Sequence, residues 1–235
     1  MGIQSQSTLI ASMILIGLAI HVYNDRRSIK FRKTFMVLLG SLSFVNAMWF
    51  LYLLSRNSVW LIGLSFGALF FSQVTRRFFE RFTRRGFTAL TRSLDAVSAV
   101  WICLLVADLL FETHLVTSAL VLFITAFFTL ATCAFSLWKL MVRRQTARQK
   151  TEATRLGYLI IGGLVTLALT CVDFLATLNF PVPALGHLSL TIYMYFWMQI
   201  VLRSRLLDLK EVLGRGLSML SLSTIITLIY ILMLA

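Results

Sequence analysis

Long apolar runs alternate with short polar connections along the whole chain. Runs such as FMVLLGSLSFVNAMWFLYLL at 35–54 and LIIGGLVTLALTCVDFLATL at 159–178 are as long as a helix must be to cross a bilayer. Because these runs are continuous rather than alternating, they favour helices over the strands of a membrane barrel. They predict an all-α integral membrane protein, a polytopic helical bundle forming one membrane domain at 1–235, with about eight transmembrane helices at 7–23, 35–54, 57–74, 94–111, 116–138, 156–178, 187–202 and 217–235.

The basic residues predict how these spans are threaded. Lys and Arg number five in 24–34, six in 75–93, six in 139–155 and four in 203–216, whereas the alternate connections hold only Arg56. Short cytoplasmic loops of membrane proteins carry such an excess of positive charge. We therefore expect these basic connections in the cytoplasm and the N-terminus outside.

Composition narrows the class of protein and its partners. Hydrophobic residues make up 59% of the chain and charged residues 13%, about half the charged share of a soluble domain. The net charge is +13, and 21 of the 22 Lys and Arg residues lie in alternate loops, so we expect anionic lipid head groups as partners and no nucleic acid. The sequence has no P-loop, G-x-S-x-G or H-E-x-x-H motif, and its three cysteines lack metal-site spacing. We therefore expect no enzymatic activity in this chain and no cofactor or metal.

Several ionisable side chains lie near the predicted outer ends of the spans, where almost no Lys or Arg accompanies them. They are Asp108, Glu112, His114, Asp173 and His187. Asp108 lies about 4.5 Å and Asp173 about 7.5 Å from the outer end of its span, at 1.5 Å per residue. Acids inside a membrane are costly and mark functional sites, and histidine responds to pH near neutrality. The group predicts a site for a proton, a cation or a polar ligand. The alternative is that each side chain caps its own helix end or reaches water alone.

Other polar or small residues inside the spans are assigned to packing. Asn46, Gln73 and Gln199 carry amides that are expected to link helices by hydrogen bonds. The G-x-x-x-G motif from Gly63 to Gly67 allows close helix contact. It leaves both a homodimer and packing within the bundle open.

The connection at 75–92, TRRFFERFTRRGFTALTR, interleaves phenylalanines with arginines. Phe78, Phe79 and Phe82 share one face of a helix, and arginines occupy the rest. This pattern predicts a short amphipathic helix lying on the anionic membrane surface. The expected membrane-surface contacts are Arg76, Arg77, Phe78, Phe79, Phe82, Arg84 and Arg85.

A basic segment, VLRSRLLDLKEVLGRGLSML at 201–220, connects the last two predicted spans. Arg205 and Asp208 are three residues apart and can pair on a helix surface. We interpret 203–216 as a cytoplasmic elbow that passes helix motion onward. A solvated connection without a signalling role is the alternative.

This segment and RLGYLIIGGLVTLAL at 155–169 carry a family resemblance. The chain resembles the N-terminal multi-span sensory region of bacterial sensor histidine kinases of the seven- to nine-span type, in layout throughout and in residues over about 155–230. In that family the seventh helix ends in a similar Arg-x-Arg-Leu-x-Asp elbow, and the matching residues here are Arg203, Arg205, Leu206, Asp208 and Arg215. The resemblance implies a signal-transducing region of a two-component system in the bacterial inner membrane, with Arg203, Arg205, Asp208 and Arg215 in signal transmission.

The sequence departs from that family at its C-terminal side. It has no phospho-acceptor His motif, no ATP-binding lobe and no ninth span. The chain stops at LIYILMLA without a polar flank, so we expect that Ala235 is not the natural end. Any kinase output would then belong to a longer parent protein.

Two other functions stay open from the sequence. A small polytopic transporter or channel subunit is the main alternative, although the only prolines, Pro181 and Pro183, lie in a predicted outer loop and no internal repeat is visible. A membrane enzyme acting on lipid would need an acid/base or metal cluster on the inner face, which offers mainly arginine. The sequence leaves the stimulus open as a small molecule or an ion.

Overall fold

The computed structural model describes residues 3–24, 32–55, 57, 59–83, 88–111, 119–147, 150–177 and 185–202, and the structural findings below concern these residues. They form helices and no strand. The helices are α1 (Ile3–Asn24), α2 (Arg32–Ser55), α3 (Val59–Thr83), α4 (Thr88–Phe111), α5 (Ala119–Gln145), α6 (Lys150–Thr177) and α7 (Gly186–Leu202).

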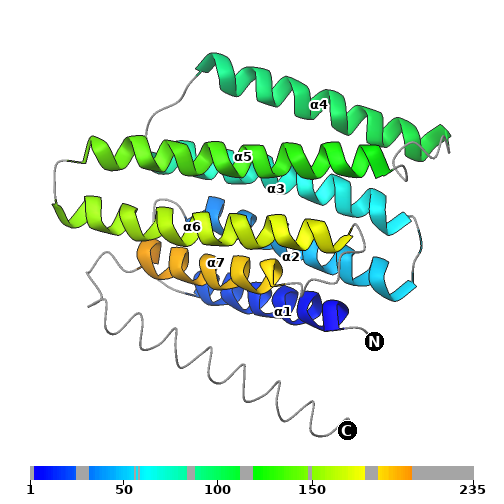
Figure 1. Ribbon diagram of the computed structural model, residues 1–235, viewed down its shortest axis with the longest axis horizontal. Helices are drawn as coiled ribbons and strands as arrows, with labels where there is room; N and C mark the ends of the chain where they lie inside the picture. Colours follow the sequence, from blue (N-terminus) through cyan, green and yellow to red (C-terminus); the bar gives the residue numbers. More distant parts are fainter. Residues whose placement is uncertain are drawn as a thin grey trace, which may run out of the picture.

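Six of the helices form a closed ring, and α4 lies outside it (Figure 1). The main contacts join α1 to α2, α2 to α3, α3 to α5, α5 to α6 and α6 to α7, and α7 closes the ring against α1. α4 packs on α3, where Leu105 meets Leu69, and the indole of Trp101 donates to the Thr125 hydroxyl of α5 over 2.9 Å. The ring places α7 beside α1, which is far from it in sequence.

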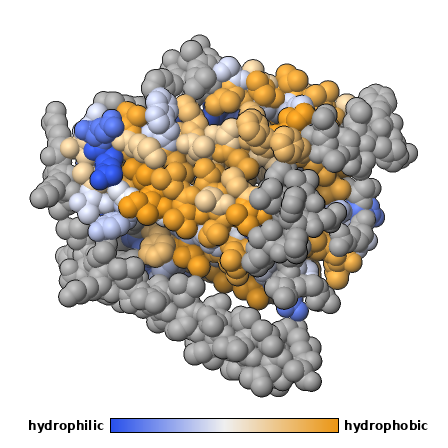
Figure 2. Space-filling view, viewed as in Figure 1, coloured by the Kyte–Doolittle hydropathy of each residue, from blue (hydrophilic) through white to orange (hydrophobic). Residues whose placement is uncertain are grey.

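Within the described ranges, five helices are long and apolar enough to cross a membrane: α1, α2, α3, α5 and α6. The apolar stretch of α4, Ser93–Ala107, is shorter, and α7 has 17 residues. On the face drawn in Figure 2, apolar residues cover the middle and hydrophilic ones lie toward the ends. The prediction of an all-helical bundle is confirmed for the described residues, and five of its helices could cross a membrane, but the number of eight spans is not confirmed. The predicted span 217–235 and elbow 203–216 lie outside the described residues.

The prediction of a surface helix at 75–92 is wrong for its first half. α3 continues without a break from the apolar span to Thr83, and α4 begins at Thr88. Phe71, Phe78 and Phe82 follow one another at helical spacing, so the stripe of α3 that faces the bundle extends past residue 75.

The side chains in this stretch are correspondingly buried. Phe78 is 0% exposed and Phe79 is also buried, and both pack on Trp197 of α7 instead of facing lipid. Arg76 is buried as well, while Arg77 is exposed. Phe82 is half-buried against the same indole. Arg84 and Arg85 lie outside the described residues.

The G-x-x-x-G motif of α3 packs inside the bundle. A methyl group added to Gly67 would lie 2.9 Å from the ring of Phe44, and one added to Gly63 would lie 2.9 Å from the sulfur of Met48. Both neighbours belong to α2, so the small residues allow α2 and α3 to approach closely. The described contacts of this motif therefore need no second copy of the chain.

Candidate functional site

A polar cluster of three side chains joins α2, α6 and α7. Nδ1 of His187 lies 2.7 Å from Oδ1 of Asn46, and Nε2 of His187 lies 3.8 Å from Oδ2 of Asp173. The backbone N–H of His187 also donates to that same Asp173 oxygen over 3.1 Å. Asp173 and His187, which the sequence placed at one end of the bundle, are therefore in direct contact. We call Asn46, Asp173 and His187 the polar cluster.

The start of α7 is built to receive the Asp173 carboxylate. The first N–H groups of a helix have no partner within it, and the helix dipole favours a negative charge there. Gly186 leaves room for this contact, because an added Cβ would lie 2.6 Å from Oδ2 of Asp173 and 2.8 Å from Cα of Thr170. A carboxylate on α6 thus caps α7 across the helix interface.

The hydrogen bonds of Asn46 fix the proton on the imidazole. Nδ2 of Asn46 donates to the carbonyl of Leu42 over 3.0 Å, which leaves Oδ1 to accept from Nδ1 of His187. In the neutral ring Nε2 then carries no proton, and this nitrogen is the one nearest the Asp173 carboxylate. A proton or a cation arriving here would bridge Nε2 and the carboxylate.

Asp173 differs from the other three acids whose side chains the structure describes. Each of these three is paired with Lys or Arg: Glu80 with Lys139 at 3.2 Å, Glu152 with Arg143 at 2.9 Å, and Asp95 with Arg76. Asp173 is only 8% exposed, and its Oδ1 has no hydrogen-bond partner among the described residues. A buried, unsatisfied carboxylate oxygen is costly and marks a place for a bound proton, cation or donor group.

An aromatic side chain flanks the cluster. Trp49 of α2 stacks on the imidazole of His187 with ring centroids 6.4 Å apart, and Tyr52 lies next to Trp49 at 5.7 Å. α1 also packs on α7 but carries no acid or base from Ser5 to Ile20. The described groups around His187 are thus one acid, one amide and one indole.

The other half of α7 is held by rings. Trp197 meets Phe78 at 5.2 Å and both Phe79 and Phe82 at 5.1 Å, each edge to face. We call Phe78, Phe79, Phe82 and Trp197 the aromatic cluster. Such edge-to-face contacts add to the burial of the rings, so α7 is fixed to α3 about 15 Å along its axis from His187.

Between these two clusters α7 lies tightly against α6. The Tyr193 hydroxyl donates to the carbonyl of Leu159 over 3.0 Å, and Ser189 bonds Thr166 over 3.3 Å. A methyl group added to Gly163 would lie 2.7 Å from the Tyr193 hydroxyl. The absence of a side chain at Gly163 is what lets the two helices meet there.

The basic side chains gather at the end of the bundle where α3 and α5 end and α6 begins, which we call the basic end. Arg76 is 2% exposed and bonds Asp95 of α4 and the Gln73 side chain, the latter over 2.8 Å. Gln73 also bonds Ser98 of α4. The expectation that Asn46 and Gln73 link helices is confirmed, since they join α2 to α7 and α3 to α4.

The remaining predicted site residues are not brought to the polar cluster by the described part of the chain. Asp108 belongs to α4, outside the ring of six helices, and its side chain lies outside the described residues. Glu112 and His114 also lie outside them, as do Arg203, Arg205, Asp208 and Arg215. Trp49 was not anticipated, because a tryptophan in an apolar run carries no sign of a polar neighbour.

The described residues contain no group of three His, Cys, Asp or Glu side chains that could hold a metal ion. Comparison of the chain with protein-family models, with curated proteins and with solved structures found no match. The function is therefore inferred from the geometry of the polar cluster and of α7.

Proposed function

We propose that this chain is a membrane-embedded sensor and signal-transducing region, of the kind that bacterial two-component histidine kinases carry before their catalytic domains. The stimulus acts at the polar cluster, and α7 carries the response toward the basic end. One observation supports this most directly. α7 begins on a buried carboxylate that lacks a Lys or Arg partner among the described residues, and it is held again, about 15 Å further along, by the aromatic cluster.

The proposed mechanism has two arrangements of α7. With Nε2 of His187 unprotonated, the contact with Asp173 consists of the backbone hydrogen bond at 3.1 Å. Protonation turns Nε2 into a donor and draws the imidazole toward the carboxylate, which shifts the first turn of α7 against α6. A ligand biases such an equilibrium only by binding one arrangement more tightly than the other. Because α7 is a continuous helix, the shift reaches Trp197.

The direction of signalling follows from the basic residues. If the basic end faces the cytoplasm of a bacterial inner membrane, the N-terminus and the polar cluster face the outside. The response then leaves α7 toward Arg203, Arg205, Asp208 and Arg215, and an output domain would follow in a longer parent protein. The resemblance to sensor histidine kinases includes this same segment, from Arg203 to Arg215, and supports its assignment to signal transmission.

The proposal is tested by ¹⁹F NMR of the chain labelled with 5-fluorotryptophan in lipid nanodiscs. The five tryptophans include Trp49 beside His187 and Trp197 in the aromatic cluster. On titration from about pH 8 down to about pH 4, we expect the resonances of Trp49 and Trp197 to move with the same midpoint. Trp138, which is 48% exposed, serves as the internal reference and should not follow it.

Two variants connect the response to the polar cluster. In His187→Gln, which keeps a hydrogen-bonding side chain beside Asn46, both titrations should disappear. In Asp173→Asn both should weaken, because the proton loses its carboxylate partner. A Trp49 titration with a motionless Trp197 would contradict signal transmission through α7.

A transporter or channel subunit is the competing function. Transporters often bind their substrates where helices are broken near the middle of the membrane, whereas α2 runs without a break past Asn46 and α6 runs without a break past Asp173. This continuity favours the sensor. Uptake of ²²Na⁺ by liposomes that contain the purified chain, lost in Asp173→Asn, would overturn our preference.

A further inference from the structure

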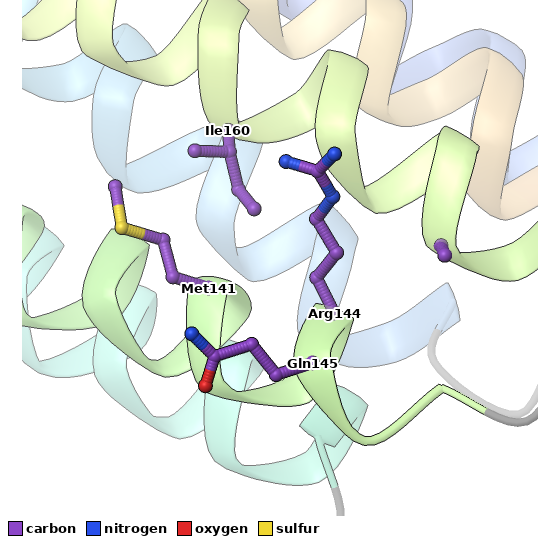
Figure 3. A pocket seen from close by; sticks show the side chains of 5 residues that line it. Met141, Arg144, Gln145 and Ile160 are labelled. Atoms are coloured by element: carbon purple, nitrogen blue, oxygen red, sulfur yellow. The ribbon is translucent and has the colours of Figure 1, made fainter.

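A cavity of about 310 Å³ opens between α5 and α6 at the basic end (Figure 3). It is lined by Met141, Arg144, Gln145, Ala153 and Ile160. The guanidinium of Arg144 extends from α5 toward α6, and the side chain of Ile160 lies across from it. The cavity is unrelated to the polar cluster, which lies near the opposite end of α6.

The charge of Arg144 is not neutralised by the described residues. Its neighbour Arg143 pairs with Glu152, whereas Arg144 makes no ion pair or side-chain hydrogen bond within the described part of the chain. Instead its guanidinium carbon lies 3.5 Å from where a Cβ on Gly157 would be, so it rests against the bare backbone of α6. An arginine held in this way presents free N–H donors to the cavity.

The cavity combines this charge with apolar walls. Met141 and the buried Ile160 supply the apolar part, and Gln145 adds a polar group next to Arg144. Beside the cavity on α6, Tyr158 and Ile161 are exposed, which continues the apolar surface outward. Arg144 is in the last turn of α5, at the level where a spanning helix meets the lipid head groups. The cavity therefore combines a positive charge, an apolar wall and a position at the level of the lipid head groups.

We propose that this cavity binds the head group of an anionic phospholipid. The phosphate accepts hydrogen bonds from Arg144, as guanidinium and phosphate pair well, and Gln145 bonds the glycerol region. The first methylene groups of the acyl chains lie on Met141 and Ile160. The volume is at the lower limit of pockets that hold a small ligand, so it takes a head group rather than a whole lipid. A free anion would gain nothing from the apolar wall, which favours lipid over inorganic phosphate.

Native mass spectrometry of the full chain, released from detergent, tests the site by counting bound lipids during titration. The probes are phosphatidylglycerol, phosphatidylcholine with the same acyl chains, and inorganic phosphate. A Lys or Arg side chain near an anionic lipid surface contributes about 1 kcal/mol to the binding free energy. We therefore expect the first phosphatidylglycerol to bind about fivefold more tightly than phosphatidylcholine. Arg144→Gln should abolish this preference, and Arg144→Lys should retain most of it because a lysine still contacts phosphate as a point charge.

Matched variants separate the cavity from general positive charge. Arg77→Gln removes an exposed arginine of α3 that does not line the cavity, and it should keep the preference within about twofold. Ala153→Leu fills the cavity without changing charge and should weaken phosphatidylglycerol binding as Arg144→Gln does. Equal losses in Arg77→Gln and Arg144→Gln would overturn the site. Saturation by inorganic phosphate at the same affinity would overturn the lipid assignment.

Discussion

The carboxylate of Asp173 accepts the backbone N–H of His187 over 3.1 Å, so a side chain of α6 caps the first turn of α7. The same oxygen lies 3.8 Å from Nε2 of the imidazole. One carboxylate therefore both holds the start of the helix and faces the group that can take a proton. A change of charge on the ring acts directly on the joint between α6 and α7.

Removing the charge of Asp173 should weaken the pH response without lowering the stability of the fold. In Asp173→Asn the amide oxygen still accepts the His187 N–H and a buried charge is gone, so the free energy of unfolding should stay within about 1 kcal/mol of wild type or rise. In Asp173→Ala the acceptor is lost, and we expect a decrease of about 1–3 kcal/mol. Unfolding in mixed micelles measures both variants. A loss in Asp173→Asn as large as in Asp173→Ala would mean that the charge stabilises the fold.

Gly186 is predicted to tolerate no side chain. A Cβ there would lie 2.8 Å from Cα of Thr170, and backbone cannot move aside as a flexible side chain can. Gly186→Ala should therefore lower the free energy of unfolding by about 1–3 kcal/mol and detach the start of α7 from Asp173. Unfolding measurements, together with hydrogen exchange of the His187 amide, check both effects.

Gly40 gives the matched control for this substitution, because no described residue lies within 4 Å of an added Cβ. Gly40→Ala should leave the free energy of unfolding unchanged or raise it by up to about 1 kcal/mol, since alanine is the better helix former. Equal behaviour of the two glycine variants would show that Gly186 is not in close contact with α6.

The pair between Arg76 and Asp95 should respond unequally to removal of its two members. The Arg76 side chain is 2% exposed and that of Asp95 is 45% exposed, so water can solvate the acid but not the guanidinium. Asp95→Ala should lower the free energy of unfolding by about 2 kcal/mol, less than for a fully buried pair because Gln73 still accepts from Arg76. Arg76→Met should cost less, and the double variant should recover most of the loss. Equal losses for both single variants would contradict this burial pattern.

Trp197 should carry much of the stability at the basic end. It is 1% exposed and meets three phenylalanine rings of α3. Trp197→Ala should lower the free energy of unfolding by about 3–5 kcal/mol. Trp138, at 48% exposed, is the control, and Trp138→Ala should cost less than about 1 kcal/mol. If Trp197→Ala and Trp138→Ala both changed the free energy of unfolding only slightly, the phenylalanines would not be packed on Trp197. The membrane-surface location predicted from the sequence would then be favoured.

The positions of the helices could be predicted closely because the long apolar runs locate them. The predicted spans 35–54 and 187–202 correspond to helices at 32–55 and 186–202. The alternation of basic loops also placed Asp173 and His187 at the same end of the bundle. The position of a helix depends on the length of its apolar run, and the end of the bundle at which a residue lies depends on the direction of its helix. Both can be determined along the sequence without knowing any tertiary contact.

The partners across the bundle could not be predicted. Asn46 and His187 are 141 residues apart, and nothing local to either residue indicates the other. Phe78 and Phe79, set among arginines, match a membrane surface as well as a protein core. Their burial depends on Trp197 covering them, and the burial of Arg76 depends on Asp95 and Gln73. These are tertiary contacts that no periodicity encodes.

The coupling along α7 is tested most directly by reciprocity. If protonation at the polar cluster alters the aromatic cluster, then a change in the aromatic cluster must alter protonation by the same free energy. Phe79→Leu changes a ring that meets Trp197 at 5.1 Å without touching the polar cluster. For a coupling of about 1 kcal/mol or more, the pH midpoint that Trp49 reports should move by at least about 0.7 units.

Phe128→Leu, at the contact between α4 and its neighbours, is the control and should leave the midpoint unchanged. We therefore measure the ¹⁹F midpoint of Trp49 in the wild type, Phe79→Leu and Phe128→Leu. A shift confined to Phe79→Leu is the predicted result. An unchanged midpoint in a Phe79→Leu protein whose Trp197 resonance has moved would contradict coupling along α7.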